Sequence, residues 1–263
     1  MKILKFPLKA KKTLEDAWQE LEDAGYDLLY ASEDEQGAYI YTRHKPVFSP
    51  LLNVGAPEEE RLPETDWERQ WQEHAPNYNQ GFMDLDLTGY GKSQLSAIRL
   101  ASGPGFGDLS HPTTRLSLEF LAKEITPQTT VIDIGCGSGI LALAALGLGA
   151  KEAIGIDIDP AALVHAEKNA IANQLGSRCH FILPQEFVLP NPPIVVAMNM
   201  IRSEQLEAWR SLPALHQQQA VIITSGILAE EREAYLKITA SWQWRLFSEK
   251  EMSGWLAFKF AQS

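Results

Sequence analysis

The stretch from Val131 to Leu141 constrains the fold more than any other part of the sequence. It runs from apolar residues into three alternating glycines, Gly135, Gly137 and Gly139, and then into apolar residues again. Glycine has no Cβ, so a ligand can lie against the backbone N–H groups where a helix begins. The pattern predicts a buried strand, a ligand-binding turn and a helix in direct succession.

Apolar stretches and helical patterns continue to alternate after Pro127, and the apolar stretches have no polar face. Strands of this kind, separated by helices, indicate a parallel sheet that is covered on both sides. The expected strands are 130–134, 153–156, 179–183, 194–198 and 220–224, and the expected helices are 139–146 and one that starts at Pro160. Two last stretches, 242–247 and 255–260, predict an antiparallel hairpin. We therefore expect an α/β fold with a Rossmann-like, mostly parallel sheet and a terminal antiparallel hairpin.

A small α+β domain is expected before this sheet. Its predicted elements are a strand at 3–6, a helix at 13–24 that ends at Gly25, and a hairpin of strands 27–31 and 38–42. Residues 45–62 are rich in proline and carry the acidic triplet Glu58 to Glu60, which predicts an irregular linker. A short helix at 66–74 follows, and it places Trp67 and Trp71 on one face, a spacing typical of packing between domains.

The charge balance excludes some classes of partner. The chain has 34 acidic and 23 basic residues, a formal net charge of −11, so direct nucleic-acid binding is not expected. An acid excess favours a basic protein partner instead. The two cysteines, Cys136 and Cys179, have neither metal-ligand spacing nor a disulfide pattern, so we expect no metal and a cytoplasmic location. No apolar run is long enough for a signal peptide or a membrane span.

Two acidic residues beside the glycines indicate which ligand binds. Asp157 ends the next strand, 22 residues after Gly135, where a carboxylate can accept both ribose hydroxyls of an adenosine ligand. Asp133 precedes Gly135 by two and can face the ammonium group of a methionine. NAD is disfavoured because Ile140 stands where its fingerprint needs a small residue, and the lysine of a Walker-type loop is absent. The expected cofactor is S-adenosylmethionine.

Three of these residues also allow plainer interpretations. Asp133 could cap loop amides, and Asp157 could be a turn residue that caps the next helix. Cys136 lies within the glycine turn, where a cysteine could be a nucleophile, but the sequence offers it no histidine or aspartate partner. A small side chain that fills the turn is the better interpretation of Cys136.

Several motifs together resemble the PrmA family, the bacterial methyltransferases of large-subunit ribosomal protein eleven. They are the stretches 133–141, 155–160 and 225–228, the Pro-Gly-Phe-Gly at 104–107, the His-Pro-Thr-Thr at 111–114, and Asp66-Trp67. The resemblance covers about residues 66 to 260. It implies three parts: a substrate-recognition domain at 1–62, a linker helix with a cofactor-covering loop at 63–110, and a methyltransferase domain at 111–263.

The resemblance also implies an activity and a set of site residues. The activity is methylation of lysine side chains or an α-amino group on a ribosomal protein, by a monomer. The loop before the methyltransferase domain implies Phe106, His111 and Thr113 as residues that cover the cofactor and shape the amine channel, although a helix-entry turn would use the same residues. The cofactor-binding candidates are Phe106, Thr113, Asp133, Gly135, Cys136, Gly137, Gly139, Asp157, Ile158 and Asn199, and the catalytic candidates are Asn199, His111 and Thr113.

Asn199 ends the fourth strand of the expected sheet, and its side-chain carbonyl can accept a hydrogen bond from an amine. A turn-forming asparagine is the alternative. His111 could accept a proton or be a structural histidine. The chain has Asp108-Leu109-Ser110 where the family has Thr-Gly-Thr, and Asn199-Met200-Ile201-Arg202 where the family has Asn-Ile-Leu-Ala. If Asp108 and Arg202 block the channel, the chain is a non-catalytic cofactor-binding protein; a diverged methyltransferase of another protein or a small molecule is the other alternative.

Overall fold

The computed structural model describes residues 2–26, 28–34, 37–43, 51–61, 78–91, 94–104 and 111–262. The chain divides into two compact units, 1–66 and 67–263. The predicted helix with Trp67 and Trp71, and the site candidates Phe106 and Asp108, lie outside the described residues. Among the described helices, none combines the length and the apolar composition that crossing a membrane requires.

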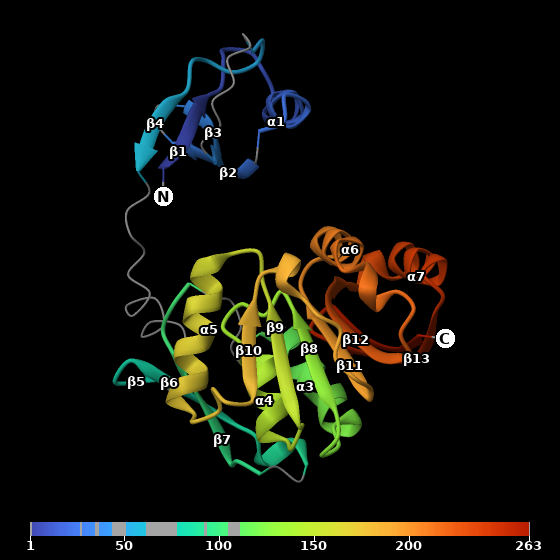
Figure 1. Cartoon of the computed structure of the whole chain (residues 1–263). Coiled ribbons are helices and arrows are strands. Elements are labelled where there is room, and N and C mark those ends of the chain that lie inside the picture. Colours follow the sequence, from blue (N-terminus) through green and yellow to red (C-terminus); the bar gives the residue numbers. More distant parts are fainter. Residues whose placement is uncertain are drawn as a thin grey trace. The chain divides into compact units, whose positions relative to one another are not determined.

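The first unit is the expected α+β fold. Its antiparallel sheet has the order β2-β3-β1-β4, and one helix packs on it (Figure 1). The elements are β1 (Lys2–Pro7), α1 (Leu14–Asp23), β2 (Leu28–Asp34), β3 (Gly37–Arg43) and β4 (Glu58–Arg61). α1 begins where the Thr13 side chain accepts from Asp16 N, and it buries Ala17 and Leu21 against Phe6 and Ile40.

The prediction of an irregular linker through 45–62 is wrong for its last part, because residues 58–61 form β4. This strand pairs with β1 and places Glu58 opposite Lys5. Charged residues suit an edge strand, since one side of it has no neighbouring strand. The acidic triplet therefore belongs to a strand, although its composition is typical of a loop.

The second unit contains a seven-stranded mixed sheet with the order β10-β9-β8-β11-β12-β14-β13. The first five of these strands are parallel, and β14 and β13 are antiparallel, as the sequence predicts. The strands are β8 (Thr130–Ile134), β9 (Glu152–Ile156), β10 (Cys179–Ile182), β11 (Ile194–Asn199), β12 (Ala220–Leu228), β13 (Trp244–Met252) and β14 (Trp255–Gln262). The closing hairpin starts two residues later than predicted and turns at Ser253 and Gly254, both with positive φ.

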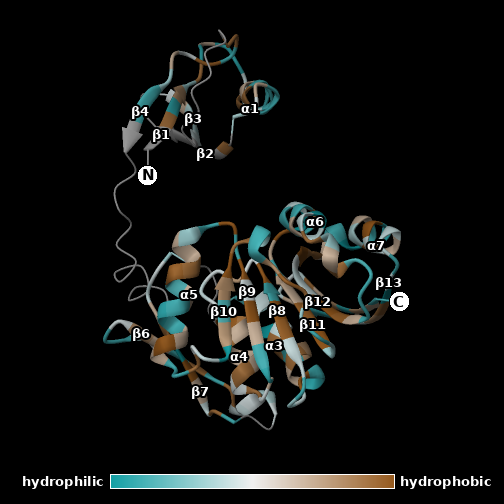
Figure 2. Cartoon of the chain, viewed as in Figure 1, coloured by the Kyte–Doolittle hydropathy of each residue, from teal (hydrophilic) through white to brown (hydrophobic). Residues whose placement is uncertain are grey.

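Helices cover both faces of this sheet (Figure 1). They are α3 (Pro112–Glu124), α4 (Ile140–Gly147), α5 (Pro160–Ala172), α6 (Arg202–Ser211) and α7 (Arg232–Ser241), with short turns η2 (Pro184–Glu186), η3 (Pro213–Leu215) and η4 (Ala229–Glu231). β8 contributes to two cores: Val131 packs with residues of α3 and α4, while Ile132 and Ile134 pack with Trp209 of α6 and Tyr235 of α7. The apolar colours in Figure 2 accordingly concentrate on the strands, and α6 is mostly hydrophilic.

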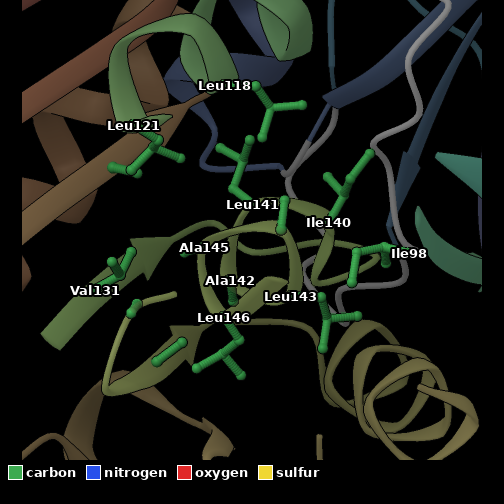
Figure 3. Packing of buried hydrophobic residues seen from close by; sticks show 14 of the residues in the cluster. Ile98, Leu118, Leu121, Val131, Ile140, Leu141, Ala142, Leu143, Ala145 and Leu146 are labelled. Carbon is green, nitrogen blue, oxygen red and sulfur yellow. The ribbon is translucent and has the colours of Figure 1, made fainter. Parts of the chain in front are cut away.

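α4 is buried on every side, which requires a further layer. Its residues from Ile140 to Gly147 are all buried, and Figure 3 shows them between Val131 of the sheet, Leu118 and Leu121 of α3, and Ile98. Ile98 belongs to an antiparallel sheet that the sequence analysis did not anticipate. Its elements are β5 (Tyr78–Asn79), β6 (Phe82–Asp86), η1 (Thr88–Tyr90) and β7 (Ala97–Ala101). A helix that is apolar all round needs such a cover, so the composition of α4 was the available signal.

Candidate cofactor and amine site

The strand order of the large sheet reverses between β8 and β11. β9 and β10 lie on one side of this pair, and β12 lies on the other. The register pairs Ile134 with Met198, so the next residues, Gly135 and Asn199, emerge together at the carboxyl edge. Ligands of open α/β sheets bind in the crevice outside such a reversal. The predicted cofactor loop and the predicted catalytic asparagine are thus brought to one place.

The glycine loop needs glycine at all three positions. Gly135, Gly137 and Gly139 have φ of +69°, +52° and +79°, a region that other residues rarely adopt. The N–H groups of Gly135 and Cys136 both donate to the Ile156 carbonyl, at 2.7 and 3.1 Å, which ties the loop to the end of β9. Gly135 is exposed, while the rest of the loop is buried. A ligand at this edge would therefore meet bare backbone at Gly135.

Asp133 is fully buried beneath the loop. Its Oδ2 accepts from the Ala142 N–H at 3.1 Å, so it does cap an amide near the start of α4. Burial, together with the nearby charge of Asp157, raises the pKa of Asp133 to about 7, against the effect of that hydrogen bond. A carboxylate held in this way is poised to ionise when a cation arrives.

Asp157 organises the loop and the next helix at once. Its Oδ2 accepts from Gly137 N–H and its Oδ1 accepts from Asp159 N–H, each at 3.0 Å. Each carboxylate oxygen has a second lone pair, so hydroxyl donors can still bind. The next residue, Ile158, is 79 % exposed, so a flat base could lie against its side chain.

Cys136 is buried within the loop. Burial raises the pKa of its thiol well above the usual value, and the charges of Asp133 and Asp157 act in the same direction. A protonated, buried thiol is a poor nucleophile. An added Cβ on Gly155 would lie 3.0 Å from its sulfur, so the side chain fills the space between the loop and β9. This geometry favours the role of small filler.

Asn199 ends β11, and only one end of its side-chain amide has a hydrogen-bond partner in the described part of the chain. Its Nδ2 donates to the Thr114 hydroxyl at 3.4 Å. Its Oδ1 is buried and has no hydrogen-bond partner within the residues that the structure describes. Unpaired buried acceptors are rare in native proteins and need an explanation. The contact with Thr114 also shows that the neighbour of Asn199 is the second threonine of the His-Pro-Thr-Thr motif, where the sequence analysis chose the first.

His111 is the N-cap of α3. Its Nδ1 accepts from Thr113 N–H at 3.4 Å and lies 2.7 Å from the Thr113 hydroxyl, and its ring meets Trp255 edge-on at 5.2 Å. Thr113 is buried, and its hydroxyl contacts His111. The two predicted catalytic partners of Asn199 therefore contact each other at the start of the helix, as a helix-entry turn requires.

Comparison with known proteins places this geometry in a family. The family model described as ribosomal protein L11 methyltransferase (PrmA) matches residues 11–263. The chain belongs to this family. Its members are S-adenosylmethionine-dependent protein methyltransferases, and the fold and the glycine loop described above are those of such an enzyme.

Individual relatives agree with this assignment, and one solved structure shares the fold. The chain is 33 % identical over 227 residues to the ribosomal protein L11 methyltransferase of Haemophilus ducreyi, which covers 82 % of this chain and 78 % of the relative. It is 36 % identical over 190 residues to that of Escherichia coli O8, covering 70 % and 64 %. The crystal structure of ribosomal protein L11 methylase from Lactobacillus delbrueckii has the same fold, with a TM-score of 0.57 and 22 % identity over 68 % of this chain and 98 % of that one.

The sequence analysis missed a row of polar side chains on α5 of this methyltransferase. Asn169 is fully buried; its Oδ1 accepts from Ala101 N–H at 2.8 Å, and its Nδ2 donates to the Ser138 carbonyl at 2.9 Å. One turn away, His165 Nε2 lies 2.7 Å from the Ala101 carbonyl, and Asn173 exchanges two hydrogen bonds with the Arg99 backbone. The row fastens β7 to the glycine loop. The spacing of His165, Asn169 and Asn173, each four residues from the next and thus on one helical face, was the available signal.

Arg202 follows Asn199 closely, and the sequence analysis raised it as a cation that could block the amine channel. The structure pairs its Nε with Glu231 Oε1 of η4 at 3.1 Å. Both side chains are only partly exposed. The guanidinium charge is thus opposed by a carboxylate on the neighbouring element, and the side chain is held toward η4.

Proposed function

We propose that this family member transfers methyl groups from S-adenosylmethionine to amine nitrogens of ribosomal protein L11, on lysine side chains or an α-amino group. The observation that carries the proposal is the buried Asn199 Oδ1, which lacks a partner within the described residues and lies at the same sheet edge as Gly135. An amine N–H would satisfy this acceptor. The protein substrate follows from the family to which the chain belongs.

The role of Asn199 is to orient the amine. A lysine ammonium, with a usual pKa of about 10.4, has no lone pair and must lose a proton before it can accept a methyl group. Desolvation at the sheet edge favours the neutral amine, and a carbonyl acceptor turns one N–H toward the protein, so the lone pair points elsewhere. In the structure the Thr114 hydroxyl accepts from Nδ2, which leaves the Oδ1 end of the Asn199 amide for the amine.

The residues at the edge fit S-adenosylmethionine. When bound, the cofactor supplies a methyl group on a cationic sulfonium. We assign Asp133 to its ammonium group, Asp157 to the ribose hydroxyls and Ile158 to the adenine, while the backbone of Gly135, Cys136, Gly137 and Gly139 lies against it. The exposed backbone of Gly135, which has a φ of +69° at this edge, supports this. Phe106 and Thr113 remain assigned to the covering segment by resemblance.

The ion pair of Arg202 supports catalysis over a purely cofactor-binding role. A free cation beside Asn199 would repel an ammonium group as it approaches. Glu231 opposes that charge, so the departure from the family's alanine at this position need not close the channel. The same argument favours an amine as the acceptor, because the edge also presents the carboxylate of Asp157.

We further propose three parts for the chain. Residues 1–62 recognise the substrate, residues 63–110 link the two units and cover the cofactor, and residues 111–263 carry out the methyl transfer. The support is that the first unit packs around a core of its own, with Leu4, Phe6, Leu21 and Ile40. It therefore needs no residue of the methyltransferase sheet in order to fold, and it is free to serve binding. The formal net charge of −11 suits a basic protein partner.

Single-turnover kinetics of Asn199→Ala test the central assignment. With saturating S-adenosylmethionine, we expect the rate of methyl transfer to L11 to fall roughly tenfold to a hundredfold, the effect of losing one acceptor of about 1 to 3 kcal/mol. Affinity for the cofactor, measured by calorimetry, should stay near wild type. Asn79→Ala, an exposed asparagine on β5, is the matched control and should behave as wild type.

Two outcomes would contradict the proposal. Wild-type turnover in Asn199→Ala would mean that this asparagine only shapes the turn. Radiolabelled transfer into L11 and into whole-cell lysate, followed by mass spectrometry of the labelled band, tests the substrate itself. Label on another protein alone would make the chain a diverged methyltransferase, and no label with intact cofactor binding would make it a non-catalytic binder.

A further inference from the structure

A buried glutamine lies directly beneath the turn that carries Asn199. Gln205, on the first turns of α6, is fully buried. Its Nε2 donates to two backbone carbonyls, that of Met200 at 2.7 Å and that of Ser225 at 2.8 Å. Its Oε1 accepts from the Tyr235 hydroxyl of α7 at 2.6 Å. Both N–H groups and the carbonyl of the amide are thus engaged by three different elements.

These hydrogen bonds occur where β11 and β12 part. The parallel ladder ends with Asn199 opposite Ser225, and β12 then bulges at Gly226, which has a φ of +91°. An added Cβ on Gly226 would lie 2.4 Å from the Met200 carbonyl, so the two backbones approach as closely as glycine permits. Beyond the last ladder pair, Gln205 supplies the donors that a strand would otherwise supply.

The turn that Gln205 holds contributes to the amine-binding part of the candidate site, at Asn199, and contacts the cofactor loop, at Gly135. Asn199 carries the unpaired acceptor, and the methyl group of Met200 lies over Gly135 of the cofactor loop. Tyr235 is fully buried against Phe258 and Phe260, and burial raises its pKa, so the phenol stays protonated and can donate. A rotation of the Gln205 amide would therefore break a hydrogen bond at each end.

We propose that Gln205, oriented by Tyr235, is a positioning residue for methyl transfer, because it fixes the turn that presents the Asn199 carbonyl to the amine. The inference rests on the proposed function of Asn199. It assigns Gln205 no contact with substrate or cofactor. Its effect passes through the position of Asn199 alone, and that distinguishes it from a residue that only stabilises the core.

The test compares two variants with a control from the same domain. Gln205→Met keeps the volume and removes the hydrogen bonds, and Tyr235→Phe removes only the hydroxyl. Gln262→Met is the control, because the Gln262 Nε2 also donates to two backbone carbonyls, those of Leu215 and His216, at 3.1 and 2.6 Å. Each variant is measured for single-turnover rate, for affinity for S-adenosylmethionine, for melting temperature, and for amide hydrogen exchange in residues 198–204.

We expect Gln205→Met to lower the single-turnover rate about tenfold and Tyr235→Phe about threefold, with cofactor affinity within about twofold of wild type. Amide exchange at 198–204 should be faster in both variants. Gln262→Met should lower the melting temperature and leave the rate and this exchange unchanged. In an Asn199→Ala background, Gln205→Met should cause no further loss of rate, since both changes remove the same contact.

The outcomes distinguish a failure of the positioning role of Gln205 from a failure of the proposed function of Asn199. If Asn199→Ala is slow while Gln205→Met and Tyr235→Phe turn over at the wild-type rate, the positioning role is wrong and the proposed function stands. If the losses from Gln205→Met and Asn199→Ala add, Gln205 acts on stability and not through Asn199. If Asn199→Ala keeps wild-type turnover, the proposed function fails and this inference fails with it. If Gln205→Met does not fold, Tyr235→Phe decides alone.

Discussion

We expect Asp133 to make cofactor binding depend on pH, and its raised pKa sets the expected size of the effect. The carboxyl group is fully buried, and its pKa rises from the usual 3.8 to about 7. A difference of about three pKa units, at about 1.36 kcal/mol each, means that ionising Asp133 in the free protein costs about 4 kcal/mol more than in water. If the ionised form binds the ammonium group of S-adenosylmethionine, binding must release the proton of the Asp133 carboxyl group.

The expected change follows from the ionised fraction. At pH 5.5 about 3 % of Asp133 is ionised, and at pH 7 about half is, so affinity should rise about fifteenfold between these values. The measurement stays below pH 7 because the α-amino group of the ligand itself has a pKa of about 7.7 to 8.0. Calorimetry in buffers of different ionisation enthalpy should detect about half a proton released per cofactor bound near pH 7.

The stability of the free protein should show the opposite trend. A pKa that is raised in the folded state stabilises the fold fully below pH 3.8, and this contribution is lost as the pH rises through about 7. Asp133→Asn keeps an acceptor for the Ala142 N–H and cannot ionise. It should therefore be at least as stable as wild type above pH 7, although it binds the cofactor more weakly.

Two controls make this reasoning refutable. Asp133→Asn should bind S-adenosylmethionine with an affinity that does not change between pH 5.5 and 7. Methylthioadenosine has the nucleoside but no ammonium group, so its affinity for the wild-type protein should also be constant. Equal pH dependence for both ligands in the wild-type protein would show that Asp133 does not face the ammonium group and only caps the start of α4.

Two further predictions concern the other end of the cofactor and the first unit. Asp157→Ala should weaken S-adenosylmethionine binding by about 1 to 3 kcal/mol in calorimetry, because ribose hydroxyls lose a charged acceptor and Gly137 N–H loses its partner; unchanged affinity would remove Asp157 from the site. Deleting residues 1–62 should leave cofactor affinity nearly intact and abolish methylation of L11, and loss of cofactor binding in a still folded truncation would place the boundary elsewhere.

The sequence by itself determined the local structure and the cofactor loop. Strands that are apolar on both faces predicted that β8 to β12 run parallel, because such strands are stable only between two layers of helices. The glycines at 135, 137 and 139 predicted a turn that other residues cannot adopt, and all three have positive φ. These features can be predicted from the sequence because each depends on residues that are close together in the chain.

The tertiary structure decided which distant residues meet. Nothing in the spacing of the chain indicated that β6 and β7 cover α4, that Thr114 and not Thr113 binds Asn199, or that Gln205 bridges the ends of two strands. The acidic triplet at 58–60 and Arg61 likewise became a strand only because β1 offered an unpaired edge. Contacts of this kind join residues that are tens of positions apart in the sequence. They form when buried polar groups and apolar faces pack against partners from other elements, and the local periodicity of the sequence does not specify those partners.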